Sequence, residues 1–139
     1  MNLYVLDTDM LTLVEEGHPM VSRQFLQRRS EEVAITVLTV EEQLSGWYTE
    51  LRKAKRPERL AWAYRRLADT VRFLSRLQIL NYDESAIQRY DQLRKHKVKV
   101  RRTDLRIAAT VLEHDGILVT RNSSDFRQVP DLKIEDWSQ

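Results

Sequence analysis

Apolar residues follow two different patterns along this chain. Some form short runs that are apolar along their whole length, which is typical of strands buried on both faces. Others recur every three or four residues, which indicates helices with one buried face. Runs and helical stretches alternate, so the pattern predicts a parallel sheet covered by helices on both sides, a three-layer α/β/α fold of about five strands. The predicted strands are residues 3–6, 33–37, 78–81, 117–120 and 132–134.

Helix starts can be read from residues that cap helices or fit a first helical turn. Thr39 is followed three residues later by Glu42, which is the spacing of a capping box. A break at residues 17–19, which include Gly and Pro, divides the segment between the first two strands into two helical stretches. The later helices are predicted to start at Thr39, Pro57, Asp83 and Thr103.

The helix that begins at Pro57 carries two groups of large apolar residues. Trp62 and Phe73 lie close together on one side of it, given a rotation of about 100° per residue. This aromatic pair has two interpretations: it packs on the preceding helix, around residues 47–52, or it forms a contact patch for a partner. The other group recurs at steps of three and four, is predicted to face the core, and consists of Leu60, Tyr64, Leu67, Val71 and Leu74.

Length and composition favour one domain over residues 1–139, with enough apolar residues (42%) for a core of its own. The absence of cysteine excludes disulfides, thiolate zinc sites, iron–sulfur clusters and a cysteine nucleophile. No apolar run approaches the ~20 residues that span a bilayer. No basic residue precedes Asp7, so we expect no secretory signal, no membrane contact and a cytoplasmic protein.

Charge is distributed unevenly, although the net charge is only +2. Residues 1–50 hold three basic and nine acidic side chains, whereas residues 51–139 hold 20 basic and 12 acidic ones. The positive excess lies in two tracts, residues 52–76 and 94–106. Such tracts favour an anionic polymer as partner, most simply nucleic acid. The alternative is that they are only the solvated faces of helices.

Three acidic residues follow predicted strands and a fourth opens the helix before the fourth strand, so all four can lie at the carboxyl edge of the sheet, where open parallel sheets form their sites. Each could have a purely local role as a turn, cap or loop residue, but together at one edge they predict a site for a divalent cation. Oxygen ligands without cysteine or suitably spaced histidine favour Mg²⁺ or Mn²⁺. Beside basic tracts, such a site indicates phosphodiester hydrolysis. The four acids are Asp7, Glu42, Asp104 and Asp125.

The segments around these acids resemble the motifs of PIN-domain ribonucleases, and the ending at residues 128–137 is similar to that of VapC-type toxins. The motif segments are residues 6–9 (Leu-Asp-Thr-Asp), 39–46 (Thr-Val-Glu-Glu-Gln-Leu-Ser-Gly), 103–109 (Thr-Asp-Leu-Arg-Ile-Ala-Ala) and 119–126 (Val-Thr-Arg-Asn-Ser-Ser-Asp-Phe). The resemblance implies that Asp7, Glu42, Asp104 and Asp125 bind the metal and carry catalysis, with Thr8, Thr120 and Asn122 as supporting polar groups.

Two positions leave the acidic set open. Glu41 stands beside Glu42, and the resemblance favours Glu42 because family members place the acid four residues before the glycine, here Gly46. Asp9 occupies a position where the family often has Asn or Ser, so it could add a carboxylate to the site or face solvent. The resemblance also implies an RNA substrate, a cognate antitoxin that lies over the site, and a homodimer.

Two other functions compete with a ribonuclease. The segment Asp7-Thr8-Asp9 suggests the nucleophile motif of haloacid-dehalogenase-type phosphatases, with Asp7 as nucleophile, but Met10 and Leu11 do not continue that motif. A non-catalytic PIN-like RNA-binding module is the other alternative. Degenerate modules of that kind usually lose acids, and all four are present here.

Overall fold

The computed structural model describes residues 2–139 and contains the predicted five-stranded sheet. All strand pairs are parallel and the strand order is β3-β2-β1-β4-β5. No helix of the described residues is long and apolar enough to cross a bilayer. In chain order the elements are β1 (Tyr4–Leu6), α1 (Thr8–Glu15), α2 (Pro19–Leu26), a 3₁₀ turn η1 (Ser30–Glu32), β2 (Val33–Thr36), α3 (Val37–Lys53), α4 (Pro57–Leu74), β3 (Gln78–Leu80), α5 (Glu84–Arg94), α6 (Arg102–Glu113), β4 (Ile117–Val119), α7 (Ser123–Phe126) and β5 (Lys133–Glu135).

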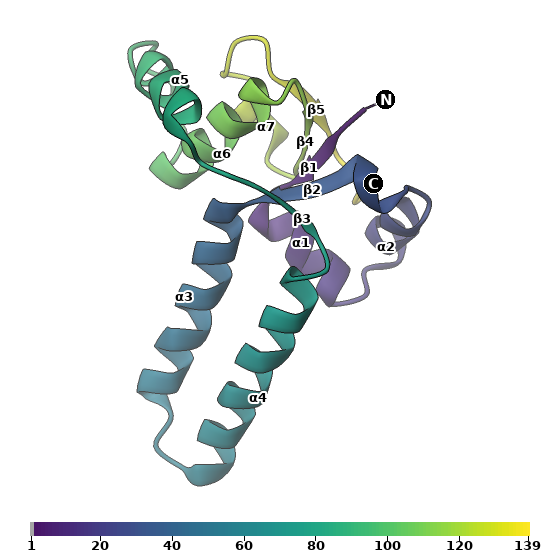
Figure 1. Ribbon diagram of the computed structural model, residues 1–139, viewed down its shortest axis with the longest axis vertical. Coiled ribbons are helices and arrows are strands. Elements are labelled where there is room, and N and C mark those ends of the chain that lie inside the picture. Colours follow the sequence, from purple (N-terminus) through teal and green to yellow (C-terminus); the bar gives the residue numbers. More distant parts are fainter. Residues whose placement is uncertain (1) are drawn as a thin grey trace.

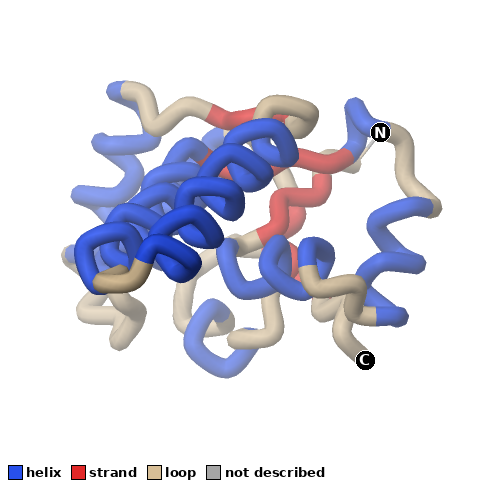
Figure 2. The backbone as a smooth tube through the Cα atoms, turned by 90° about the horizontal axis from the view of Figure 1, so that it is seen from below, coloured by secondary structure: helices blue, strands red, loops and turns tan. Residues whose placement is uncertain are grey.

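The three layers follow from strands that are buried on both faces. Successive strand residues point to opposite faces, and each face has its own apolar cluster. Val5 and Leu118 pack with residues of α5, α6 and α7, whereas Leu6 and Val119 pack with residues of α1, α2 and α4. The sheet therefore has helices on both sides, and α3 and α4 form a long hairpin that extends away from it (Figure 1). Seen from below, this helix pair stands in front of the sheet (Figure 2).

Two helices begin earlier than their sequence predicts, and the caps differ accordingly. β2 leads directly into α3, so Thr36 is the N-cap and its side chain accepts a hydrogen bond from the Thr39 amide (3.4 Å). Thr39, expected as the cap, is one turn inside the helix and fully buried. Helix α6 likewise begins at Arg102 rather than after Thr103, and Arg101 occupies its N-cap position. The starts at Pro57 and after Asp83 are confirmed.

The predicted core face of α4 is wrong in most of its length. Tyr64 and Val71 are 57% and 49% exposed, and Leu60 is also exposed. The buried side of the helix instead faces α3, where the rings of Trp62 and Trp47 meet edge to face at 5.5 Å. Trp62 is half-buried against α3, and Phe73 is half-buried against the apolar cluster that contains residues of α1 and α2. The packing interpretation of Trp62 is therefore confirmed.

The segment after β5 closes the α1–α2 side of the sheet. Trp137 is buried, with its ring 5.6 Å from that of Tyr4 on β1. The guanidinium of Arg28 lies 4.4 Å from the centres of both rings. These contacts connect the last strand, the first strand and the segment after α2.

Helix α1 ends in a Schellman motif that requires a left-handed residue. The amide of His18 donates to Leu13 O (2.9 Å) and that of Gly17 donates to Val14 O (3.1 Å). Gly17 has φ +76°, a conformation that glycine adopts without steric cost. The break predicted at residues 17–19 is therefore confirmed.

Two glycines provide a matched test of these backbone effects, because a Cβ on either would meet no atom within 4 Å. Gly46 lies inside α3, so Gly46→Ala should raise the free energy of unfolding by about 0.5–1 kcal/mol. Gly17→Ala should lower it by about 1 kcal/mol, because alanine is strained at positive φ. Urea unfolding of the two variants and the wild type measures both changes. Equal effects of the two substitutions would contradict the assignment of helix interior and left-handed cap.

Candidate functional site

The candidate site lies where β1 ends between its two neighbours. β1 pairs with β2 on one side and with β4 on the other, so the chain winds in opposite directions from this central strand. In open parallel sheets this reversal leaves a crevice at the carboxyl ends of the strands. Asp7 follows β1 directly, and Thr120 follows β4.

Asp7 is held at this edge by helix α1, which it caps. Its Oδ1 accepts a hydrogen bond from the Met10 amide (2.9 Å), and the side chain is buried. Desolvation by burial raises the pKa of Asp7 to about 6. The hydrogen-bonding groups of Thr120 and Met10 oppose this shift, whereas the charge of Asp104 adds to it. At neutral pH the carboxylate is therefore charged in a place that favours its protonated form.

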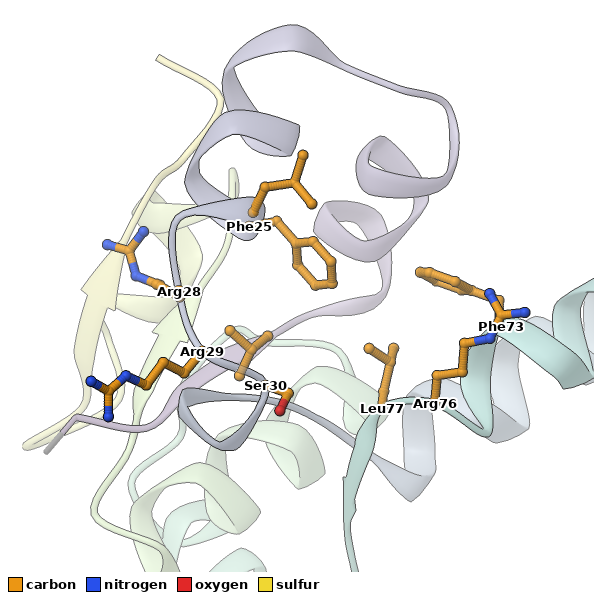
Figure 3. A pocket seen from close by; sticks show the side chains of 9 residues that line it. Phe25, Arg28, Arg29, Ser30, Phe73, Arg76 and Leu77 are labelled. Carbon is orange, nitrogen blue, oxygen red and sulfur yellow. The ribbon is translucent and has the colours of Figure 1, made fainter.

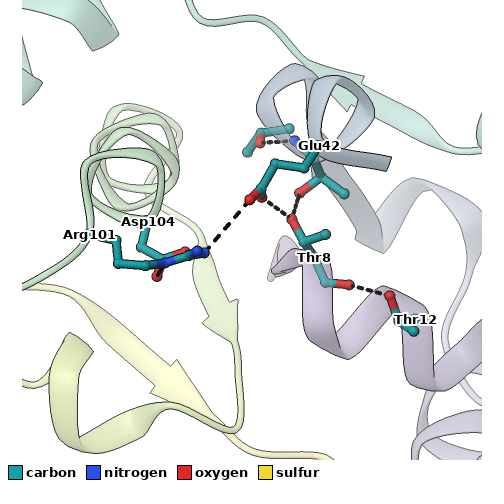
Figure 4. A network of polar contacts seen from close by, with 7 residues as sticks. Thr8, Thr12, Glu42, Arg101 and Asp104 are labelled. Carbon is teal, nitrogen blue, oxygen red and sulfur yellow. Dashed lines mark hydrogen bonds and ion pairs between the residues drawn. The ribbon is translucent and has the colours of Figure 1, made fainter. Parts of the chain in front are cut away.

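Glu42 reaches the same edge from the second turn of α3. Its Oε1 accepts a short hydrogen bond (2.6 Å) from the Thr8 hydroxyl, which is also 3.0 Å from the hydroxyl of Thr39 (Figure 4). This contact joins the start of α1 to α3 and leaves the second carboxylate oxygen of Glu42 for other partners. Glu41 is exposed and does not line the pocket, which agrees with the choice of Glu42.

Asp104 lies in the first turn of α6 and faces Arg101. The Arg101 guanidinium makes two contacts with it, from Nε to Oδ2 (3.1 Å) and from Nη2 to Oδ1 (3.3 Å). Nη2 also lies 3.7 Å from Oε2 of Glu42. In Figure 4 the guanidinium points from α6 across the gap to Glu42. One arginine thus bridges two of the predicted acids.

Asp125 and two of the predicted supporting residues, Thr120 and Asn122, form a separate chain of hydrogen bonds beyond β4. The Asn122 amide N–H donates to Thr120 Oγ1 (2.9 Å), and Asn122 Nδ2 donates to Asp125 Oδ2 (2.9 Å). Asn122 lines the pocket, whereas Asp125 does not. With its NH₂ group bound to Asp125, Asn122 has its carbonyl oxygen available to the pocket. Asp125 therefore orients Asn122 in this arrangement.

Together these residues line a pocket of about 270 Å³. The residues that line it are Asp7, Thr8, Asp9, Glu42, Arg101, Asp104 and Asn122. Apart from the guanidinium, its polar groups are carboxylates, a hydroxyl and an amide, a donor set of oxygens that suits Mg²⁺ or Mn²⁺. As the side chains lie, no three Asp, Glu, His or Cys residues within positions 2–139 are gathered closely enough to hold a metal ion. The donor chemistry fits such an ion, and Arg101 now occupies the position between two of the carboxylates.

Two pocket residues fall outside the predicted set. Asp9, which the sequence left either in the site or facing solvent, lines the pocket. Arg101 carried a signal in the sequence, because it stands three residues before Asp104 and one helical turn brings such residues together. The charge pattern alone places it only within the basic tract of residues 94–106.

Residues 4–132 match the protein family described as "PIN domain". The "tRNA(fMet)-specific endonuclease VapC" of Shigella flexneri is 28% identical over 139 residues, covering 97% of this chain and 98% of that protein.

Solved structures of VapBC complexes share the fold of this chain. The DNA-bound VapBC structure from Salmonella typhimurium matches with a TM-score of 0.79 at 28% identity and covers 99% of both chains. VapBC2 from Rickettsia felis, bound to a promoter DNA fragment, matches with a TM-score of 0.74 at 25% identity, covering 97% of this chain and 98% of that one.

The buried carboxyl of Asp7 predicts a dependence of stability on pH. Its pKa is about 6 in the folded protein against 3.8 ordinarily, so the folded state binds this proton more tightly than the unfolded state. Stability should therefore fall by about 3 kcal/mol as pH rises from about 4 to about 6, and stay level above that. Asp7→Asn removes the charge and keeps an oxygen that can cap α1.

We expect Asp7→Asn to be more stable than the wild type by on the order of 1–3 kcal/mol at pH 7.5, with the difference vanishing near pH 4. Urea unfolding in EDTA across this pH range is the measurement. Asp83→Asn makes the same change at the exposed N-cap of α5 and serves as control, with little expected effect. A wild type as stable as Asp7→Asn at pH 7.5 would show that the charge is not costly there.

Proposed function

Because this chain belongs to the PIN-domain family and is a nuclease of the VapC type, we propose that it is a cytoplasmic endoribonuclease that depends on Mg²⁺ or Mn²⁺ and serves as the toxin of a toxin–antitoxin pair. One observation carries the chemistry of this proposal. Asp7, Glu42 and Asp104 come from three separate elements and line a single pocket at the carboxyl edge of the sheet.

The residues of the pocket have distinct roles in this mechanism. Asp7, Glu42 and Asp104 would hold the metal ion, with Asp9 beside them. When bound, the ion would polarise the phosphate and lower the pKa of an attacking water. Thr8 fixes the Glu42 carboxylate through its 2.6 Å hydrogen bond.

Asn122, held by Asp125, offers its amide oxygen to a water or ligand in the pocket. Asp125 therefore contributes by orienting Asn122. This role is in addition to the direct metal-binding role predicted for Asp125. Thr120 serves the same segment, because its hydroxyl accepts from the Asn122 backbone.

The basic tracts supply affinity for the RNA backbone. One tract ends in α6 beside the pocket, and the other covers the end of α3 and most of α4. Contacts of this kind bind phosphate without regard to sequence and weaken as salt increases. The two competing functions are not favoured: membership of the PIN family does not support a phosphatase with Asp7 as nucleophile, and the complete acid set argues against a non-catalytic module.

A separate surface fits the proposed antitoxin. Phe25, Phe73 and Leu77 point into a pocket of about 350 Å³ formed by the end of α2, the segment after it, and the end of α4 (Figure 3). Arg28, Arg29 and Arg76 also line this pocket. An apolar floor with a cationic rim suits an amphipathic segment with acidic residues. This pocket lies near the start of β2, and the antitoxin would extend from it over the acidic site.

The family resemblance also implies a homodimer. The outer face of α4 supports this part of the proposal, because Leu60, Tyr64 and Val71 leave a row of apolar side chains in solvent. Contiguous exposed apolar surface of this kind is typical of protein–protein contacts.

RNA cleavage tests the proposed activity. Wild type should cleave a structured RNA with MgCl₂ or MnCl₂ and stop in EDTA. Asp104→Asn should lower the cleavage rate at least about a hundredfold, because it removes a carboxylate of the metal site, while RNA binding in a gel-shift assay stays intact or improves. The control is Asp91→Asn, an exposed acid on α5 outside the pocket. Cleavage that persists in EDTA or in Asp104→Asn would refute the metal-dependent mechanism.

The antitoxin surface can be tested at Leu26, which lines the apolar pocket and is 79% exposed. Leu26→Glu should weaken binding at least about tenfold, because it places a charge in an apolar contact. The probe is a synthetic amphipathic peptide with acidic residues, and its binding is measured by isothermal titration. Met20→Glu, an exposed position on the same helix outside the pocket, is the control. Equal effects of both variants would exclude this pocket as the binding surface.

A further inference from the structure

Arg101 is the single cation among the described residues that line the acidic pocket. Its guanidinium makes two contacts with Asp104, at 3.1 and 3.3 Å, and reaches within 3.7 Å of Glu42. The hydrogen bond and charge of Asp104 hold the pKa of Arg101 above its usual range. These are the carboxylates that the proposed function assigns to a divalent cation.

The surroundings of Arg101 argue against a purely structural ion pair. Its side chain is 71% exposed, whereas those of Asp104 and Glu42 are 13% and 26% exposed. Exposed ion pairs contribute little to stability because water screens them. Burial therefore does not hold the arginine in place, while the carboxylates that it contacts are fixed by α6 and by the Thr8 hydrogen bond. The arginine can leave them without disturbing the elements that carry them.

We propose that Arg101 has two successive partners at this site: Glu42 and Asp104 while no metal ion is bound, and a phosphate of the RNA substrate once those carboxylates hold a divalent cation. This inference rests on the proposed nuclease function. A guanidinium and a metal ion compete for the same carboxylate oxygens, and their like charges repel when both lie beside the same carboxylates. The planar fork that grips Asp104 through two contacts matches the oxygens of a phosphate equally well.

Substrate binding would then give the displaced Arg101 its second partner. An arginine displaced from the carboxylates stays within one side-chain length of the pocket, because Arg101 is the N-cap residue of α6 and Asp104 is in its first turn. A backbone phosphate entering the pocket brings one negative charge, shared by two acceptor oxygens, near this free guanidinium. Arg101 would thereby favour RNA in the metal-loaded site and balance the acids in the empty one.

The neighbouring residue offers a matched control. Arg102 is exposed, belongs to the same tract, and forms no ion pair with any residue of the described chain. Arg102→Gln changes the net charge by the same amount as Arg101→Gln, one position further from the acids. Arg101→Lys keeps the charge but loses the planar fork.

Metal binding in the absence of RNA tests the first part of the proposal, that Arg101 contacts Glu42 and Asp104 while no metal ion is bound. Isothermal titration of the metal-free protein with MnCl₂ should show tighter binding to Arg101→Gln than to wild type, by about threefold to tenfold, because a competing positive charge is gone. Arg101→Lys and Arg102→Gln should stay within about twofold of wild type. Arg101→Gln that binds Mn²⁺ as wild type does, or more weakly, would overturn the proposal.

Steady-state cleavage at saturating MnCl₂ tests the second part of the proposal, that Arg101 binds a phosphate of the RNA once the metal ion is bound. Arg101→Gln should raise KM for a short RNA at least about tenfold, with a smaller rise for Arg101→Lys, because the phosphate contact is weakened or lost. Arg102→Gln should raise KM by less than about threefold, as expected for one backbone charge. Equal KM values for the two glutamine variants would overturn the proposal.

The outcomes separate this inference from the function on which it rests. If wild type neither binds Mn²⁺ nor cleaves RNA, the metal-dependent nuclease itself is refuted. If wild type does both and Arg101→Gln behaves as Arg102→Gln, only the role of Arg101 is refuted. Thermal unfolding of all variants, with expected midpoints within a few degrees of wild type, shows that the effects do not come from lost folding.

Discussion

The repulsion between carboxylates at one edge of the sheet is the constraint that organises this molecule. Two such charges ~4 Å apart cost about 4 kcal/mol at an effective dielectric of 20, and this pocket is lined by four acidic residues. The fold opposes that cost with local devices: the amide of Met10 on Asp7, the hydroxyl of Thr8 on Glu42, and the guanidinium of Arg101 on Asp104. The raised pKa of Asp7 has burial as its largest cause, and the charges of Asp9 and Asp104 add to it. An active site that is costly in the absence of its ligand is a common exchange of stability for function.

The sheet could be predicted from the sequence because strand burial and parallel order leave a strong local signal. All five strands were predicted to within one or two residues of their observed bounds. β4 and β5 were predicted from their own apolar residues, without reference to the strands beside them. The helices were predicted less well where two signals competed. Thr39 and Thr103 both look like caps, but both helices begin earlier: α3 follows Thr36, where β2 ends, and α6 follows Arg101, which ends a loop after α5. The types of residue near a helix start do not show where the preceding strand loses its hydrogen-bonded neighbour.

The face of α4 shows a different limit. A helical wheel reveals apolar stripes but not which stripe has a neighbour, and α4 has its neighbour, α3, on the side of Trp62. The site shows the same limit in another form. The convergence of Asp7, Glu42 and Asp104 follows from topology, since strand ends meet at one edge. The indirect position of Asp125 and the bridging position of Arg101 depend on side-chain directions, which spacing alone does not determine.

The central position of β1 has a consequence for how the protein is made. Leu6 pairs with Val119 on β4, so the first strand waits for a partner that is synthesised more than a hundred residues later. At a translation rate of about 5–20 residues per second, that interval is roughly 6–20 s. During it the ribosome carries a nascent chain with one half of the crevice missing, and Asp7 has neither α6 nor β4 beside it. The order of strands in the sheet therefore delays any nuclease activity until β4, more than a hundred residues after β1, has been translated.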